Sequence, residues 1–344
     1  MDVRFEILRQ GQNAAPQVQS YSLQADPEQT VLDCLNRIKW EQDGSLAFRK
    51  NCRNTICGSC GMRIDGRSGL ACQEKLASVL ARQQSSQQAD RTLERENRLP
   101  TIAIAPLGNL PVIRDLVVDM QPFWDDLEAV DPYVSTGSRS VPEREFLQTP
   151  EQRSRLDATG NCIMCGACYS ECNAKLVAPN FVGPHALAKA RRMTADSRDA
   201  RVEERLEECN EGTGGVWGCT RCYMCNEVCP MGVAPMDRIG EIKQEILARK
   251  DASASRSIRH RKVLVELVGR GGWIDERKFG LAVVGNGFRD VAGLASLVPL
   301  GLRMLASGKF PLLFEPSQGA SEVRALIETV RTQSDLPSAT PDDK

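Results

Sequence analysis

Two four-cysteine runs constrain the fold of this chain more than any other feature of its sequence. Each run has the spacing C-x2-C-x2-C-x3-C, and the runs begin at Cys162 and Cys219. In this spacing three thiolates of one tight loop bind irons of one cubane cluster, and the fourth cysteine binds a second cluster. The pattern therefore predicts two cubane clusters that exchange their fourth ligands. The expected ligands are Cys162, Cys165, Cys168 and Cys229 for the first cubane, and Cys172, Cys219, Cys222 and Cys225 for the second.

A third cysteine motif lies nearer the N-terminus. It has the spacing C-x4-C-x2-C with one more cysteine further along, which is typical of a plant-type [2Fe-2S] site. Gly58 and Gly61 are expected to let the loop backbone fold closely around the cluster, where N–H groups can donate to its sulfurs. The expected ligands are Cys52, Cys57, Cys60 and Cys72.

Zinc is the alternative for these sites. Structural all-cysteine zinc sites usually combine two C-x2-C pairs across a longer gap, so two complete four-cysteine runs favour iron-sulfur clusters. Two cysteines fall outside any ligand spacing. Cys34 lies on the apolar stripe of a helix predicted over residues 29–40 and is expected to pack there, whereas Cys209 is expected to be a spare thiol.

Composition and charge exclude several classes of protein. With 344 residues, 41% of them hydrophobic, the chain is expected to form two or three globular domains. A net charge of -1 argues against a nucleic-acid partner. The first six residues alternate like a strand rather than forming a signal peptide, which indicates a reducing compartment. No apolar run reaches the roughly 18 residues of a membrane span, so we expect a soluble or peripheral protein.

Local patterns divide the chain further. Residues 2–9 and 17–23 alternate as a hairpin, and a capping box with Pro150 at the first helical position predicts a helix after Thr149. The expected segments are a first domain at 1–124 with an insertion at about 78–99, a connection at 125–148, a second domain at 149–249, an extension at 250–334 and a disordered tail at 335–344.

Several stretches resemble one known family, the iron-sulfur subunits of succinate dehydrogenases and fumarate reductases. The resemblance spans residues 2 to about 249. The matching stretches are residues 30–33, 46–53, 57–62, 70–72, 111–120, 196–199 and 229–230.

This resemblance implies an α+β fold class. A β-grasp [2Fe-2S] ferredoxin domain is followed by an α-helical two-cluster ferredoxin domain, and the extension is expected to be mostly helical. The resemblance also implies an FAD-containing flavoprotein partner that oxidises succinate, a membrane-anchor or quinone-handling partner, and quinone as the final acceptor. The chain is then expected to relay single electrons on the cytoplasmic side of a prokaryotic membrane, with no catalytic residue of its own. A fumarate reductase running in the opposite direction is the alternative.

The sequence departs from this family at the second four-cysteine run and near it. Familiar members lack the second cysteine of that run and hold a [3Fe-4S] cluster, whereas Cys222 here predicts a second [4Fe-4S] cluster. The well-known members also have a Pro, a Trp pair and a His on the quinone side. Here Asn173 replaces the Pro, Leu176 and Val177 replace the Trp pair, and Thr220 replaces the His. These replacements predict a differently built acceptor site.

Two segments leave a choice open. Residues 185–209 are highly charged, and like-charge pairs such as Arg201 with Arg205 argue against intrahelical pairing, so a solvated helix or a flavoprotein-facing surface is expected. In the extension, residues 291–305 are expected to form either a buried helix or an interfacial one that meets a partner or membrane, and residues 256–262 to face anionic lipid.

The extension also resembles the tail of heterodisulfide-reductase-type iron-sulfur subunits, at residues 259–262, 271–276 and 301–311. Electron delivery to thiol chemistry is therefore a further alternative. Those proteins carry paired adjacent cysteines in another domain. This chain has no adjacent cysteine pair and no cysteine after Cys229.

Overall fold

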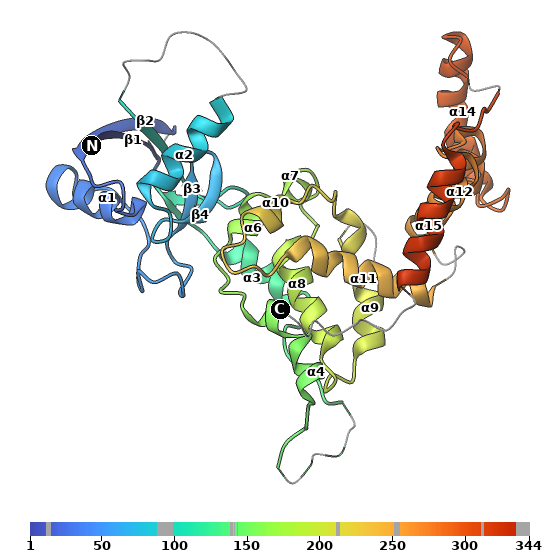
Figure 1. Ribbon diagram of the computed structural model, residues 1–344, viewed down its shortest axis with the longest axis horizontal. Helices are drawn as coiled ribbons and strands as arrows, with labels where there is room; N and C mark the ends of the chain where they lie inside the picture. Colours follow the sequence, from blue (N-terminus) through green and yellow to red (C-terminus); the bar gives the residue numbers. More distant parts are fainter. Residues whose placement is uncertain are drawn as a thin grey trace. The chain divides into compact units, whose positions relative to one another are not determined.

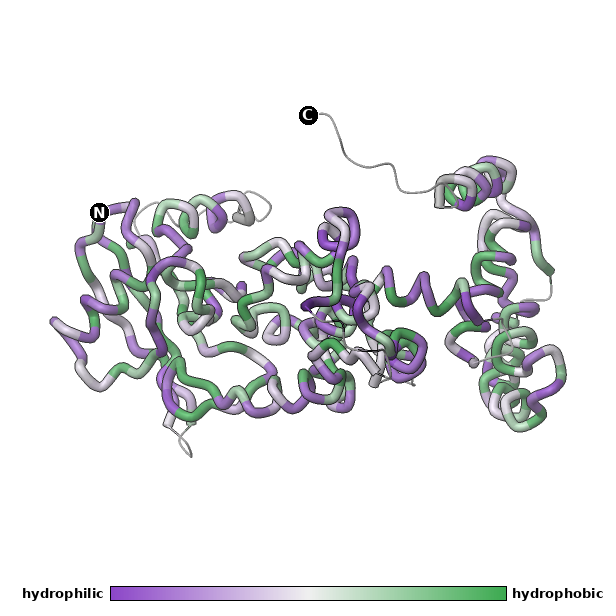
Figure 2. Tube along the Cα trace, turned by 90° about the horizontal axis from the view of Figure 1, so that it is seen from below, coloured by the Kyte–Doolittle hydropathy of each residue, from purple (hydrophilic) through white to green (hydrophobic). Residues whose placement is uncertain are grey.

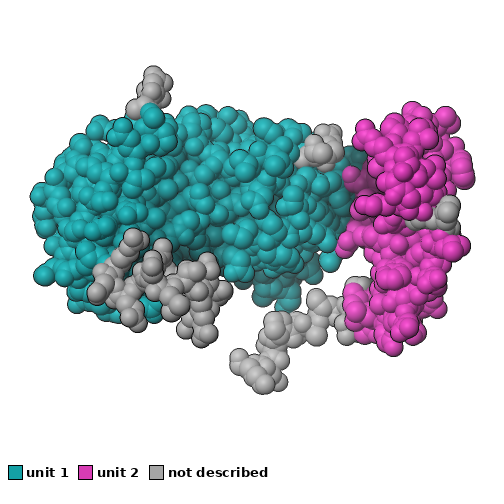
Figure 3. Space-filling model, turned by 90° about the horizontal axis from the view of Figure 1, so that it is seen from above, with its two compact units in different colours: residues 1–246 teal, residues 247–344 magenta. Residues whose placement is uncertain are grey.

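The structure is a computed structural model that describes residues 1–11, 15–87, 99–137, 140, 142, 144–210, 214–250, 255–310 and 313–334. The chain forms two compact units, residues 1–246 and residues 247–344 (Figures 1 and 3). Most of the expected insertion and all of the expected tail, residues 88–98 and 335–344, lie outside the described residues.

The first unit begins with a five-stranded mixed sheet in the order β2-β1-β5-β3-β4. The predicted hairpin is confirmed, because β1 and β2 pair antiparallel from Asp2 opposite Gln24 to Arg9 opposite Gln17. Hydrophobic and hydrophilic residues alternate along these strands (Figure 2), which places one row of side chains in the core. The strands are β1 (Asp2–Arg9), β2 (Gln17–Gln24), β3 (Gly61–Ile64), β4 (Arg67–Leu70) and β5 (Thr101–Ala105).

Helix α1 (Val31–Arg37) completes the core of this sheet. The Thr30 hydroxyl accepts from the Asp33 N–H, and the Asp33 carboxylate accepts from the Thr30 N–H, so a capping box starts the helix. The helix continues as a π-helix, Ile38–Gln42, in agreement with the predicted helix over 29–40. Cys34 is fully buried in the core, which confirms its expected packing role.

The rest of the first unit is mostly helical and carries one small two-stranded sheet. Helix α8 lies at the centre of the helices, because α3, α5, α6 and α9 all contact it. The elements are α2 (Leu76–Gln87), β6 (Val112–Arg114), β7 (Val117–Val118), α3 (Gln121–Glu128), α4 (Pro150–Ser154), α5 (Asp157–Gly160), α6 (Ala167–Ser170), α7 (Asn173–Val177), α8 (Gly183–Ala195), α9 (Val202–Asn210), a 3-10 turn (Val216–Gly218), α10 (Met224–Glu227) and α11 (Pro235–Arg249). The predicted capping box at Thr149 is confirmed at the start of α4.

The second unit is helical: α12 (Arg256–Gly271), α13 (Glu276–Val283), α14 (Val291–Ala306) and α15 (Ala320–Ser334). Helices α13 and α15 both pack on α12 around a small core. Helix α14 has no buried residue, so the expectation of a buried helix at 291–305 is wrong and the interfacial alternative remains. Among the described helices, none combines the length and the apolar character needed to cross a bilayer.

Candidate functional site

The first cysteine loop turns its backbone N–H groups toward its own sulfurs. The N–H groups of Asn54 and Cys57 lie 3.3 Å from Cys52 Sγ, and the Cys52 N–H lies 3.5 Å from Cys57 Sγ. Cys72 lies in the turn that follows β4, and its Sγ is 4.0 Å from the Thr55 hydroxyl. Such N–H groups stabilise negative charge on ligating sulfur.

The thiols of this loop have different electrostatic surroundings. A hydrogen bond between Cys57 Sγ and the Ser59 hydroxyl, 3.0 Å long, lowers the pKa of Cys57 to about 6. Burial raises the pKa of Cys60 to about 12, and the neighbouring Cys72 and Cys57 thiols add to this effect. The structure thus brings the thiols of Cys57, Cys60 and Cys72 together, with Cys52 next to Cys57.

Two glycines hold this loop against the next cysteine loop. A Cβ on Gly58 would lie 2.9 Å from Cys165 Cα and 2.9 Å from the Ile163 carbonyl oxygen, and a Cβ on Gly61 would lie 2.8 Å from the Cys165 carbonyl oxygen. Only glycine permits this approach of the two backbones. Sequence spacing indicated that these glycines fold around a cluster, but it gave no sign of their contact with Cys165.

The second site is a cavity between the two four-cysteine runs. Backbone turns with positive φ at Met164 (55°) and Gly166 (79°) shape the first run at this point. Apart from the cysteines and His185, its lining is apolar and includes Phe123 and Val233. The cysteines that line it are Cys162, Cys165, Cys168 and Cys229, the set expected from the sequence.

The third site is the matching cavity on the other run. Arg221 (φ 59°) and Tyr223 (φ 62°) turn the backbone on both sides of Cys222, which is exposed. Met236 and Ile239 of α11 close the apolar side of the cavity. The cysteines that line it are Cys172, Cys219, Cys222 and Cys225, so the fourth cysteine of each run lies in the cavity of the other run.

The buried thiols of these cavities can ionise only if a bound group supplies positive charge. Burial raises the pKa of Cys165 to about 11 and of Cys225 to about 12, and it also raises the pKa of Cys168 and Cys172. Iron offsets such desolvation when thiolates bind it, and four thiols per cavity match the ligand demand of a cubane. In the part of the chain that the structure describes, no three His, Cys, Asp or Glu side chains are grouped to hold a single metal ion.

The sheet and the cysteine helices are joined by buried polar contacts. The Ser68 hydroxyl donates to Glu171 Oε1 at 2.7 Å and lies 2.7 Å from Ser170 Oγ, which accepts from the Gly108 N–H at 2.7 Å. Arg63 forms an ion pair with Glu171 at 3.2 Å. The second cysteine run is tied to the same sheet by a hydrogen bond from Arg67 to the Glu227 carbonyl. These contacts connect the element that carries the first site to those that carry the other two.

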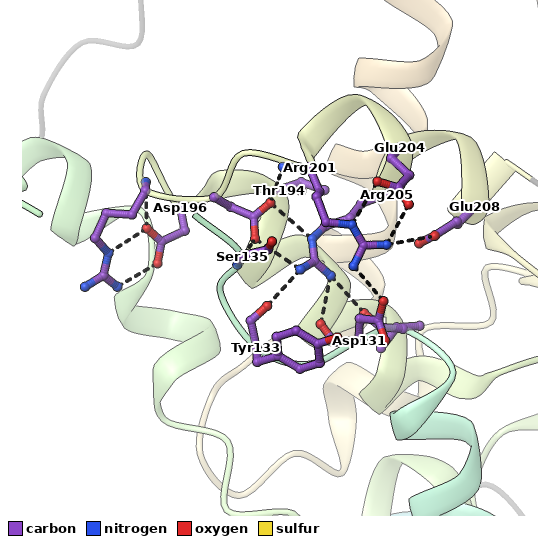
Figure 4. A network of polar contacts seen from close by, with 12 residues as sticks. Asp131, Tyr133, Ser135, Thr194, Asp196, Arg201, Glu204, Arg205 and Glu208 are labelled. Carbon is purple, nitrogen blue, oxygen red and sulfur yellow. Dashed lines mark hydrogen bonds and ion pairs between the residues drawn. The ribbon is translucent and has the colours of Figure 1, made fainter. Parts of the chain in front are cut away.

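An ion-pair network anchors the connecting segment (Figure 4). The buried Arg205 guanidinium pairs with Asp199 at 3.1 Å and donates to the carbonyls of Val130, Asp131 and Tyr133. Burial opposes ionisation of Asp199, but hydrogen bonds, led by that from Arg205, hold its pKa below the usual range.

Intrahelical pairing was not expected to explain residues 185–209, and the ion pairs of Arg201 agree with this. Arg201 directly precedes α9, and its guanidinium pairs with Asp131 of the connecting segment at 2.7 Å and with Glu204 at 2.7 Å. The expectation of a solvated helix is wrong for α9, because Arg205, Leu206 and Cys209 are buried. The partner on the connecting segment is distant in sequence, so no local pattern indicates it.

Two further residues near the cavities were not singled out by spacing. His185 stacks on Phe123 at a centroid distance of 3.8 Å and bonds the Phe123 carbonyl through Nε2 at 2.8 Å, and burial lowers its pKa to about 4. Lys243 of α11 is buried; its ammonium donates to the Cys219 carbonyl at 3.5 Å and lies 5.6 Å from the centroid of the Trp217 ring. His185 is therefore a neutral wall of the second cavity, and Lys243 is a positive charge beside the third.

Comparison with known proteins agrees with this arrangement. Residues 4–125 match the family described as 2Fe-2S iron-sulfur cluster binding domain, and residues 158–233 match the 4Fe-4S dicluster domain. The chain is 34% identical over 246 residues to the fumarate reductase iron-sulfur subunit of Escherichia coli O6:H1, covering 71% of this chain and 93% of that protein. It is 36% identical to the mitochondrial succinate dehydrogenase [ubiquinone] iron-sulfur subunit 3 of Arabidopsis thaliana, covering 63% of this chain and 65% of that protein.

A solved structure shows the same fold. A chain of the Mycobacterium smegmatis Sdh1 complex in the apo form aligns with a TM-score of 0.59 and 25% identity, over 72% of this chain and 97% of that chain. The expected fold class is confirmed: a [2Fe-2S] ferredoxin domain with a mixed sheet, a helical 4Fe-4S ferredoxin region and a helical C-terminal part. The chain therefore belongs to the family of succinate dehydrogenase and fumarate reductase iron-sulfur subunits, the electron-transfer subunits of oxidoreductase complexes.

Proposed function

We propose that twelve cysteines of this chain hold one [2Fe-2S] cluster and two [4Fe-4S] clusters. The observation that carries the proposal is the pair of cavities, each lined by four cysteines of which one comes from the other run. When bound, the clusters supply a one-electron relay from the flavin of a partner to quinone, in the order first, second and third site. The ligands are Cys52, Cys57, Cys60 and Cys72 for the [2Fe-2S] cluster, Cys162, Cys165, Cys168 and Cys229 for the first [4Fe-4S] cluster, and Cys172, Cys219, Cys222 and Cys225 for the second.

The other residues of the chain position the sites and set their electrostatics. Gly58 and Gly61 keep the first and second loops in contact, which shortens the distance between the first two sites. The N–H groups of Asn54 and Cys57 favour additional negative charge at the first site. Lys243 favours negative charge at the third site, where the electron leaves the chain.

The type of the third cluster is tested by Cys222→Ser. A cubane that loses a thiolate ligand releases the exposed iron, so the variant is expected to convert from [4Fe-4S] to [3Fe-4S] at this site. Iron analysis should fall from about ten to about nine per chain, and the oxidised variant should gain a [3Fe-4S] EPR signal. The matched control is Cys209→Ala, a buried cysteine outside the three sites. An intact wild-type complex that already shows the oxidised [3Fe-4S] signal would contradict the assignment.

We further propose that the partners are an FAD-containing succinate dehydrogenase flavoprotein and a membrane-anchor or quinone-handling subunit, on the cytoplasmic side of a prokaryotic membrane. The family resemblance and the relatives' names support this proposal. Succinate oxidation is the proposed direction, and fumarate reduction is the alternative because direction depends on the cluster potentials and on the quinone. EPR of the anaerobically purified complex, oxidised and then reduced with succinate, tests the relay. Failure of succinate to reduce any cluster would overturn it.

The proposed domain boundaries remain 1–124, 125–148, 149–249 and 250–334. The family matches at 4–125 and 158–233 support the first two domains, and the division into units near residue 246 supports a separate extension. We propose that the extension docks the subunit to a partner or to a membrane.

A further inference from the structure

The second unit exposes an unusual share of apolar surface. Thirteen of the 26 exposed large apolar side chains among the described residues lie in it, although it begins only at residue 247. Scattered exposed apolar side chains need no explanation, but a gathering of them on a small unit marks an interaction surface. Seven of the thirteen lie on or directly around α14: Phe288, Val291, Val298, Leu300, Leu302, Leu305 and Phe310.

Helix α14 has one packed side and a broad apolar side that faces solvent. Leu294 lies against Gly285, and Leu297 lies near Gly280. On the solvent side Val291, Val298, Leu302 and Leu305 recur at intervals of seven, four and three residues, which places them on one face. Arg303 is the one charged residue within the helix. A soluble helix normally shows the reverse pattern, with polar residues on its solvent side.

The charge around this helix matches an anionic surface. The described residues 255–310 and 313–334 carry twelve Lys and Arg against seven Asp and Glu, a net charge of +5 in a chain whose total is -1. Arg289, Arg303 and Lys309 are exposed on and beside α14. Asp290 is the only acidic residue between Glu276 and Glu315 in the sequence, and its carboxylate accepts from the Gly293 N–H to cap the helix.

The length of α14 indicates how it can meet a bilayer. Its 16 residues give about 24 Å of helix, less than the roughly 30 Å of a hydrocarbon core. An apolar face with flanking basic residues suits a helix that lies in the plane of the interface. A protein partner would be expected to offer acidic groups to the basic residues and one defined groove to the apolar face. Leu300, on the opposite side of the helix from Val298 and Leu302, is also exposed to solvent, so one groove would not cover all the exposed apolar side chains.

We propose that α14 binds an anionic lipid surface in the plane of the membrane and anchors this subunit to it directly. The face of Val291, Val298, Leu302 and Leu305 enters the boundary between headgroups and acyl chains. Arg289, Arg303 and Lys309 contact lipid phosphates. This anchor rests on the proposed docking role of the extension, and it requires neither a particular direction of electron flow nor a membrane subunit.

Flotation of the purified full-length chain with vesicles tests the anchor. The vesicles contain phosphatidylcholine alone, or phosphatidylcholine with about a third phosphatidylglycerol. The wild-type chain is expected to float with the anionic vesicles and to stay at the bottom of the gradient when the vesicles are neutral. Binding to the anionic vesicles should weaken at high salt. Val298→Glu combined with Leu302→Glu is expected to abolish flotation. Arg303→Gln combined with Lys309→Gln should lower the partition coefficient about 30-fold, at roughly fivefold per basic residue.

The matched control is Leu326→Glu combined with Val330→Glu, which places the same two charges at exposed apolar positions of α15 and should float like the wild type. Visible spectra of all variants verify that the clusters are intact, and far-UV circular dichroism verifies that the helices of the second unit stay folded. Flotation of the Val298→Glu, Leu302→Glu chain at the wild-type level would overturn the proposal. So would a wild-type chain that stays unbound to anionic vesicles and floats only when a purified membrane subunit has been inserted, which would identify a protein as the occupant.

Discussion

Gly58 shows how one residue can satisfy two requirements, only one of which is local. Its φ of +69° belongs to the left-handed region, and the tight cysteine loop demands such a turn. Its second requirement is the contact with Cys165, more than a hundred residues further along the chain. The first requirement follows from loop spacing and was expected. The second depends on how two separately folded loops meet, which no local pattern in the sequence encodes.

The two requirements can be separated by comparing Gly58→Ala with Gly66→Ala. Gly66 has a similar φ of +77° but nothing within 4 Å of an added Cβ. Gly66→Ala should therefore cost only the conformational strain, about 1 kcal/mol of unfolding free energy. Gly58→Ala should cost about 2–3 kcal/mol, because the backbone at Cys165 must also move. Chemical denaturation followed by tryptophan fluorescence measures both, and equal losses would show that the contact with Cys165 contributes nothing.

At the scale of elements, the sequence predicted helices correctly where residues close together in the chain determine the start or the apolar face of the helix. The capping box after Thr149 is set by side chains three residues apart, and the helix over residues 29–40 follows from apolar residues at helical spacing, so both were expected. Helix α9 is more buried than expected, because residues distant in sequence cover it and pair with its charges. Arg201 reaches Asp131, and Arg205 binds carbonyls of the connecting segment, which lies some seventy residues earlier.

This connection predicts that Arg205 is essential to the stability of the helical domain. Arg205→Ala leaves the Asp199 carboxylate buried without its partner and removes donors from three carbonyls, which should cost about 3–5 kcal/mol of unfolding free energy. The matched control is Arg201→Ala directly before the same helix, whose pairs are more exposed to solvent and should contribute much less. Thermal unfolding of the two variants measures the difference. Similar losses of stability in the two variants would show that burial of the ion pair between Arg205 and Asp199 adds no stability.

At the scale of the whole molecule, the cysteine spacing already predicted that the two runs share two sites. The exchange of fourth ligands requires the runs to lie side by side, and that single requirement fixes much of the helical domain. The sequence did not predict which other elements close the cavities. Met236 and Ile239 of α11 line the third cavity, and they come from a helix that begins after the last cysteine. Apolar spacing alone does not indicate which surface a helix will cover.

Two truncations test where the electron-transfer part of the molecule ends. A chain that stops at Lys250 keeps all of α11, including the buried Ile242 and Ile246, and should retain about ten irons and all three EPR signals. A chain that stops at Ala234 has the same twelve cysteines but lacks α11. Its third cavity loses the Met236 and Ile239 wall and the Lys243 charge, so about four irons should be lost selectively. Loss of clusters from the longer chain would show instead that the extension is part of the electron-transfer fold, and that its exposed helix serves more than attachment.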